Sequence, residues 1–146
     1  MKRTDLAYIA GLFDGEGNIC IVKRQHHSGR TVPAYHLVAR VGMVDEIIPR
    51  WLQMAFGGYI HRRRRPDPKH RDVYTWSVGY GAAADFLKII LPFLKLKKPQ
   101  AELAIKFQSE RIHTRGQTGK LGNAFKTEQA KVVDEAEYIL MRSLKR

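Results

Sequence analysis

The stretch from Thr4 to Val22 constrains the fold most, because it joins a short helix to a buried strand through four residues that are only glycine and acid. The helical half carries one apolar stripe, whose members recur every three or four residues: Leu6, Ile9, Ala10 and Phe13. A side-chain oxygen of Thr4 or Asp5 is expected to cap its first turn. The helix is predicted to stop at residues 14–17, Asp-Gly-Glu-Gly, where glycine supplies the backbone freedom to leave it.

Small residues on this helix predict a close contact with a second helix. Ala7 and Gly11 lie four positions apart, next to Ala10, so another helix can approach backbone to backbone. The two acids at the helix end lie where the helix dipole is negative, and a divalent cation would relieve that conflict because it prefers oxygen ligands. Two such helices packed side by side, with Ala7, Ala10 and Gly11 in the contact, would share a metal site between two chains. The alternative is an ordinary helix end with solvated acids.

Residues 9–17, which read IAGLFDGEG, resemble the signature of the LAGLIDADG homing endonucleases. The departures are isoleucine for the first leucine, phenylalanine for isoleucine, glycine for alanine and glutamate for the second aspartate. In that family the second acid binds the catalytic metal, so the resemblance implies this role for Glu16, with Gly15 beside it in the metal site. It implies a more structural role for Asp14. The motif occurs once here, as in the family members that act as homodimers.

The composition agrees with a nucleic-acid partner. The 146 residues include 26 lysines and arginines against 14 acids, which gives a formal charge of +12. Such a charge attracts phosphate polyanions, although membrane surfaces are anionic as well. No apolar run approaches the roughly 20 residues of a membrane span, and the first residues lack the apolar core of a signal peptide. The single cysteine, Cys20, excludes an internal disulfide, so we expect an intracellular protein without a membrane partner.

Hydrophobic periodicity predicts alternating helices and strands after the motif. Strands are expected at residues 18–25, 34–43, 59–65 and 73–79, and further helices at 45–56, 82–91, from 99 onward and 127–144. We expect a single domain over residues 1–146, with a core at about 4–111 and a basic, glycine-containing linker at 113–123. The last helix is expected to turn its apolar stripe inward: Val132, Val133, Ala136, Ile139 and Leu140. The resemblance implies an α+β fold, an α-β-β-α-β-β-α core whose four-stranded antiparallel saddle sits in the DNA major groove.

Basic side chains on the polar sides and polar ends of the strands are candidates for DNA contact: Arg24, His26, His36, Arg40, His61, Arg63 and Arg65. Three of them, His61, Arg63 and Arg65, share one face of a hairpin strand that ends in four arginines. Arginine pairs bidentately with guanine and with phosphate, whereas the alternative is a solvated charged face. The register around Trp76 stays open, because strand alternation directs it to the core while the spacing from the next helix directs it toward DNA.

The segment from Pro92 to Ala101 resembles the second recognisable stretch of the same family. The family has a lysine beside the scissile phosphate, just before a helix that begins Gln-Ala. By position that lysine is Lys97, and the alternative is an ordinary surface lysine. The family often has a glutamine near the attacking water, where Met43 stands nearest here. Either the mapping is shifted, or another group such as Arg40 or Asp45 substitutes.

These features lead to a hypothesis of function: a homodimeric, Mg²⁺-dependent homing endonuclease from an intron-encoded mobile element. In it, Glu16 of each chain holds metal at the scissile phosphates and Lys97 stabilises the developing charge. Mn²⁺ should substitute for Mg²⁺, while Ca²⁺ should allow binding without efficient cleavage. Eight strand residues span about 26 Å, or about eight base pairs, so two chains would read roughly 20 base pairs of near-palindromic double-stranded DNA and leave a staggered break. The rivals are an intron RNA maturase and a cleavage-inactive DNA-binding regulator on the same scaffold, neither of which requires a metal-binding acid.

Overall fold

The structure, a computed structural model, describes residues 1–24, 33–67, 69–118 and 127–145. The elements follow in the order α1 (Arg3–Glu16), β1 (Gly17–Arg24), β2 (Ala34–Met43), α2 (Ile47–Phe56), β3 (Tyr59–Arg63), β4 (Val73–Gly79), α3 (Tyr80–Ile90), the 3₁₀ turn η1 (Leu91–Phe93), α4 (Lys98–Thr118) and α5 (Glu128–Ser143). The α+β class and the α-β-β-α-β-β-α order are as predicted. None of the helices among the described residues is long and apolar enough to cross a membrane.

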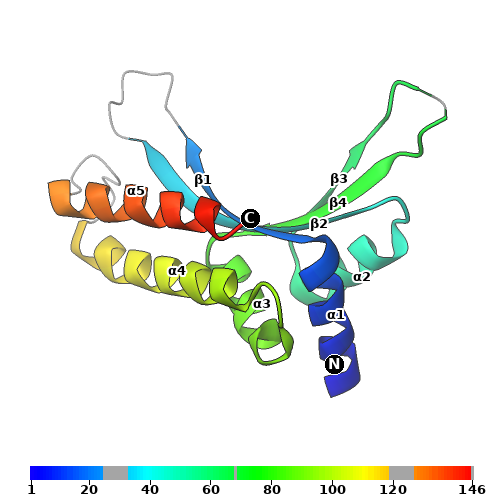
Figure 1. Ribbon diagram of the computed structural model, residues 1–146, viewed down its shortest axis with the longest axis horizontal. Helices are drawn as coiled ribbons and strands as arrows, with labels where there is room; N and C mark the ends of the chain where they lie inside the picture. The colour runs from blue at the N-terminus through cyan, green and yellow to red at the C-terminus, as the bar shows by residue number, and fades with distance from the viewer. Residues whose placement is uncertain (25–32, 68, 119–126, 146) are drawn as a thin grey trace.

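One antiparallel sheet organises the molecule, with strand order β1-β2-β4-β3. The β1–β2 and β3–β4 hairpins diverge from its centre, so the face without helices is concave (Figure 1). Helices α1 to α4 lie on the opposite, convex face, and α5 runs along the β1 side (Figure 1). The predicted saddle is therefore present, and its open face is free of helices.

Strand register assigns each side chain to one of these two faces, because directly paired residues point the same way. Ile19 pairs with Ala39, and Ala39 pairs with Val78; these residues are buried on the convex face. Asn18 pairs with Arg40, which pairs with Ser77 on the concave face. The side chains of β2 therefore alternate between the core and the concave face.

Trp76 lies in the core, which settles the register that the sequence left open. Its side chain is 0% exposed, its ring packs edge-on against Phe86 at 5.0 Å, and its indole N–H donates to the carbonyl of Gly57 at 2.9 Å. The neighbouring Gly58 has a φ of +84°, and a Cβ there would lie 2.4 Å from the carbonyl oxygen of Ser77. Only glycine suits both conditions, so the end of α2 is tied closely to β4.

The ends of α1 differ from the prediction. The helix begins after Lys2, whose backbone N–H donates to the Asp5 carboxylate at 2.9 Å, so Asp5 acts from the first turn and neither Thr4 nor Asp5 is the cap residue. At the other end the helix continues through Glu16 and ends at Gly17. The acids of the motif therefore belong to the last helical turn itself, closer to the negative end of the dipole than expected.

Two predictions about the C-terminal third are wrong. Helix α4 continues to Thr118, so the linker does not begin at residue 113, and residues 119–126 lie outside the described part. Helix α5 has the predicted extent, with Thr127 as its cap, but the opposite orientation. Its buried side chains are Asp134, Glu137 and Met141, while the expected inward residues are exposed: Val132, Val133, Ala136, Ile139 and Leu140.

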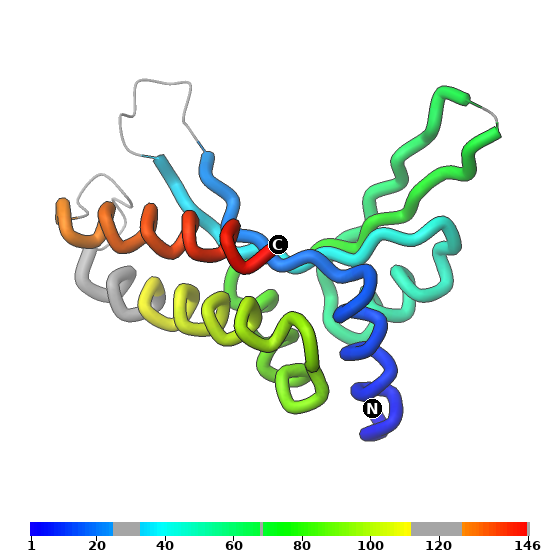
Figure 2. Tube along the Cα trace, in the orientation of Figure 1, coloured from blue at the N-terminus to red at the C-terminus, as the bar shows by residue number. Residues whose placement is uncertain are grey.

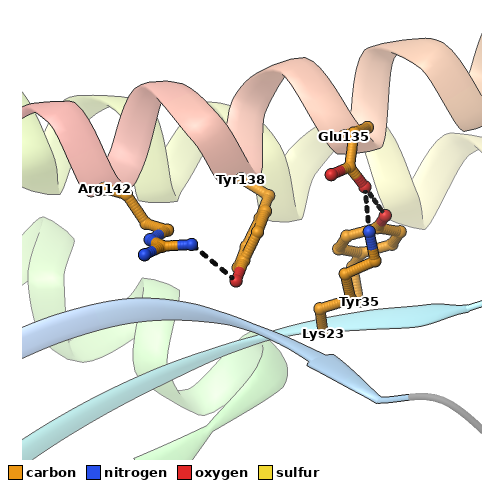
Figure 3. A network of polar contacts seen from close by, with 5 residues as sticks. All are labelled: Lys23, Tyr35, Glu135, Tyr138 and Arg142. Atoms are coloured by element: carbon orange, nitrogen blue, oxygen red, sulfur yellow. Dashed lines mark hydrogen bonds and ion pairs between the residues drawn. The ribbon is translucent and has the colours of Figure 1, made fainter.

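Polar anchors explain this orientation of α5. Glu135 accepts hydrogen bonds from Lys23 of β1, at 2.6 Å, and from the hydroxyl of Tyr35 of β2 (Figure 3). Asp134 pairs with Arg111 of α4 at 3.4 Å. These contacts require the polar side of α5 to face the sheet and α4, so the apolar stripe faces outward.

Candidate nucleic-acid interface and active site

The C-terminal turn of α1 contacts the loop that precedes α4, and so joins the two stretches that the sequence singled out. The Asp14 carboxylate accepts backbone N–H groups of Lys95 at 2.7 Å and of Lys97 at 2.9 Å. The Lys97 ammonium donates to the backbone carbonyl of Asp14. Residues 83 positions apart in sequence thus meet at one helix end, the end that carries both acids of the motif.

Asp14 is a structural carboxylate in this arrangement. Partial burial alone would raise its pKa, but the backbone N–H groups of Lys95, Lys97 and Leu96 hold the pKa of the carboxyl below its usual value. Asp14 therefore stays ionised and fixes the loop that carries Lys97. Because both oxygens of Asp14 accept backbone N–H groups, a cation at this helix end would be bound by a different carboxylate.

Glu16 is that other carboxylate, exposed in the last turn of α1 beside the half-buried Gly17. Among the described residues, no group of three or more histidine, cysteine or acidic side chains is arranged to hold a metal ion. The fit to a hard divalent cation is therefore partial: one chain offers the Glu16 carboxylate and the outward carbonyl groups of a helix end, all of them oxygen donors.

Two cations from other elements lie beside Asn18, two residues after this acid. Arg40 of β2 is exposed and lies directly across from Asn18, two residues after Glu16. The ammonium of Lys145 donates to the side-chain oxygen of Asn18 at 3.0 Å. The end of α5 is held there because the amide nitrogen of Gln100 donates to the carbonyl of Leu144 at 2.6 Å. Figure 2 shows the C-terminal end of the chain beside the start of β1.

Sequence reasoning missed Asn18 and Lys145, since 127 positions separate them and no motif includes either. The only signal was the polar Asn18 at the head of an apolar strand. Met43, considered as the counterpart of a water-positioning glutamine, lies on the convex side with its partner Tyr74 and packs against the core. The Asp45 carboxylate accepts the N–H of Ile47 at 2.8 Å at the start of α2. Of the two candidate substitutes, Arg40 is the one exposed on the concave face of the sheet.

The concave face carries most of the predicted DNA-contacting side chains. Arg24, Arg40, His61 and Arg63 are all exposed, and the strand register places them on this face. Arg65 lies beyond the end of β3, and its backbone N–H donates to Asp72 at 3.3 Å. His26 falls outside the described residues. The face therefore combines positive charge at the centre, where Arg40 lies, with positive charge on both hairpins.

Arg62 and Arg63 show how the arginine run divides between the two faces. Arg62 forms a salt bridge with Asp72 at 2.7 Å on the convex side, and this hydrogen-bonded carboxylate raises the pKa of Arg62. Arg63 pairs with Val73 on the concave side and makes no salt bridge within the described part of the chain. Because successive strand residues point to opposite faces, Arg63 is available to a partner on the concave face, whereas Arg62 is held in a salt bridge with Asp72.

His36 lies on the expected face but is only 8% exposed. The exposed ring of Tyr80 stacks on it, with ring centroids 5.2 Å apart and planes 19° from parallel. Burial, followed by the nearby charges of Arg24, Arg111 and Arg40, lowers the pKa of His36, so the imidazole is neutral at pH 7. DNA could not reach His36 without displacing Tyr80, so the expectation of a direct contact by His36 is wrong for this conformation.

The small strip on α1 is available to a partner, with one exception. Ala7 and Gly11 are exposed, and a Cβ built on Gly11 meets nothing within 4 Å. Ala10 is 0% exposed because it packs in the core of its own chain. The assignment of Ala10 to an interface is therefore wrong, and the strip consists of Ala7 and Gly11.

Solved structures of homing endonucleases resemble this chain. I-CvuI, in complex with its target in the presence of Ca, superposes with a TM-score of 0.73 at 17% identity, over 97% of this chain and 82% of that chain. I-TnaI superposes with a TM-score of 0.65 at 17% identity, over 97% and 93%. The LAGLIDADG homing endonuclease I-GzeII, in complex with its DNA target, gives 0.59 at 14% identity, over 94% of this chain and 43% of that chain. No protein-family model and no curated protein matches the sequence.

The chain therefore has the LAGLIDADG homing endonuclease fold, and the resemblance read from residues 9–17 is confirmed at the level of the fold. The alignment with I-TnaI spans nearly all of both chains, whereas this chain corresponds to less than half of I-GzeII.

Proposed function

We propose that the protein is a site-specific DNA endonuclease that acts as a homodimer and hydrolyses phosphodiester bonds with a divalent cation. The observation that carries the proposal is the junction of the two motifs, where Lys97 and Asp14 meet in the last turn that also carries Glu16. An ordinary helix end with solvated acids would not require a lysine from a distant loop to bond that turn. The exposed cationic concave face supplies a surface for double-stranded DNA.

The proposed roles follow from chemistry and position. Glu16 and the adjoining backbone oxygen of Gly15 would hold the cation, which when bound would polarise the scissile phosphate and favour ionisation of water. Asp14 fixes the loop, and through it the position of Lys97. Lys97 would stabilise the negative charge that develops on the phosphate, because its ammonium is already held at the helix end. Arg40 and Lys145 would bind neighbouring phosphates.

A homodimer follows from two features. Glu16 alone does not complete an oxygen-ligand site within one described chain, and the exposed strip of Ala7 and Gly11 runs along the same helix. Pairing of two α1 helices would bring two Glu16 side chains together and join two concave faces. Twofold symmetry would then require a near-palindromic target, cut once on each strand with a stagger.

The test uses DNA that contains the sequence flanking the chain's own gene, incubated with the protein in Mg²⁺, Mn²⁺, Ca²⁺ or chelator. The proposal expects a double-strand break with Mg²⁺ or Mn²⁺, and binding with little cleavage in Ca²⁺. Specific binding without cleavage in any metal would instead indicate a DNA-binding regulator. Binding to intron RNA in preference to this DNA would indicate a maturase.

A further inference from the structure

Helix α5 presents an apolar face to solvent. Four large side chains on it are exposed, from Val133 at 47% to Val132 at 67%, and Ala136 lies between them: Val132, Val133, Ala136, Ile139 and Leu140. They form one stripe, because their spacing of three or four residues places them on one side of the helix. The exposed Gln129 and Ser143 close the stripe at its two ends, so no charged side chain interrupts it.

The orientation of α5 is fixed from its other side. Asp134 and Glu137 are buried against α4, and Glu135 is bonded to Lys23 and Tyr35 (Figure 3). Rotation of the helix to bury the stripe would break these contacts. A contiguous apolar stripe held outward by the remainder of the fold is typical of a surface that another molecule covers.

The order of residues along the stripe identifies the partner. About Ala136 as a centre, Val133 matches Ile139, Val132 matches Leu140, and Gln129 matches Ser143. A second α5 laid antiparallel about a twofold axis at Ala136 would therefore put apolar against apolar and polar against polar. The exposed Glu128 of the first turn would lie near the exposed Arg142 of the other copy, and the two helix dipoles would run antiparallel.

We propose that α5 is a self-association surface that pairs antiparallel with α5 of a second copy of this chain. A parallel pairing would place Glu128 against Glu128 and the basic ends against each other, so charge favours the antiparallel arrangement. The surface is distinct from the strip on α1, since the two helices lie apart in the fold (Figure 1). The inference is independent of the proposed nuclease activity, because the stripe contains none of the residues proposed to act in cleavage.

The association is tested by sedimentation equilibrium of the full chain between about 1 and 100 μM, a range suited to a small interface. The mass should double with concentration, whatever species is present at the low end. Ile139→Lys should weaken this step by about tenfold or more, whereas Met54→Lys, which changes an exposed apolar side chain on α2, should not change it. A constant mass over the whole range, or equal behaviour of the two variants, would overturn the inference and assign the stripe to a different protein.

Register is tested by cysteine crosslinking in a Cys20→Ser background. Ala136→Cys should form a disulfide with its own copy under mild oxidation, because it lies at the twofold axis. Val132→Cys should not, since eight residues of helical rise, about 12 Å, would separate it from its copy, beyond the reach of a disulfide. Val132→Cys combined with Leu140→Cys should crosslink. Self-crosslinking of Val132→Cys alone would show parallel pairing and contradict the proposal.

Discussion

Substitution of Arg63 tests the proposed DNA contact of the concave face most clearly, because Arg62 beside it supplies a matched control. Arg63 is exposed on the concave face, so truncation to alanine removes no salt bridge or side-chain hydrogen bond found among the described residues. Arg63→Ala should therefore leave the melting temperature unchanged. It should cost about 1–3 kcal/mol of binding at one base pair of each half-site.

Conversion of this free energy gives the expected size of the effect. At about 1.4 kcal/mol for each factor of ten, affinity should fall by about fivefold to 150-fold for each half-site. A symmetric dimer meets the loss twice, so the product of two such factors is expected for a palindromic target. The loss should vanish when the contacted base pair is already mismatched, because the arginine then has no guanine to bind.

The assay is competition binding in Ca²⁺ against a set of targets with single base-pair substitutions. Arg62→Ala, which removes the salt bridge with Asp72 on the convex side, should lower thermal stability slightly and leave the preference at every base pair intact. If Arg63→Ala weakened binding equally on all sequences and reduced its salt dependence, Arg63 would contact phosphate instead. If Arg62→Ala changed the sequence preference and Arg63→Ala did not, the assignment of faces would be wrong.

Three further predictions concern the junction and the α1 strip. Asp14→Asn should destabilise the fold by about 1 kcal/mol through lost hydrogen bonds to the α4 loop. Because folding lowers the pKa of Asp14, its contribution to stability is complete above the usual aspartate pKa and is lost as pH falls through the pKa in the folded state. The melting temperatures of variant and wild type should therefore converge in acid, and a difference that stays constant with pH would contradict this. Lys97→Met should reduce the single-turnover cleavage rate by about 10²–10³-fold while its DNA affinity stays within a few-fold of wild type. An unchanged cleavage rate would show that Lys97 is an ordinary surface lysine. A Cβ at Gly11 meets nothing within 4 Å outside its own helix turn, so Gly11→Leu should keep the fold. It should nevertheless be monomeric by sedimentation at about 1 μM and lose double-strand cleavage, whereas a normal dimer would exclude the α1 interface.

Local patterns predicted the parts of the fold that depend on short-range physics. The apolar stripe of α1, the alternation of β2 and the split of Arg62 from Arg63 follow from periods of 3.6 and 2 residues, which the chain obeys. The junction of Asp14 with Lys97 was predictable only through the family resemblance, because nothing in composition or spacing joins positions 83 apart.

Long-range contacts account for what the sequence did not reveal. Helix α5 has a clear amphipathic pattern, but ion pairs to Lys23 and Arg111 turn its polar side inward against that pattern. The contact of Lys145 with Asn18 depends on where α5 ends in space. His36 has the period of an exposed residue, yet Tyr80, at the positive φ of 57° that begins α3, folds over it.

Glu16 is proposed as the cation-binding acid of a DNA endonuclease. Its role is tested most directly by measuring cleavage and binding side by side for Glu16→Gln. Glu102→Gln, which changes an exposed glutamate on α4 in the same way, is the control. We predict that Glu16→Gln loses detectable cleavage in Mg²⁺ while binding the target within about tenfold of wild type, and that Glu102→Gln retains both. Cleavage by Glu16→Gln at the wild-type rate would contradict the account.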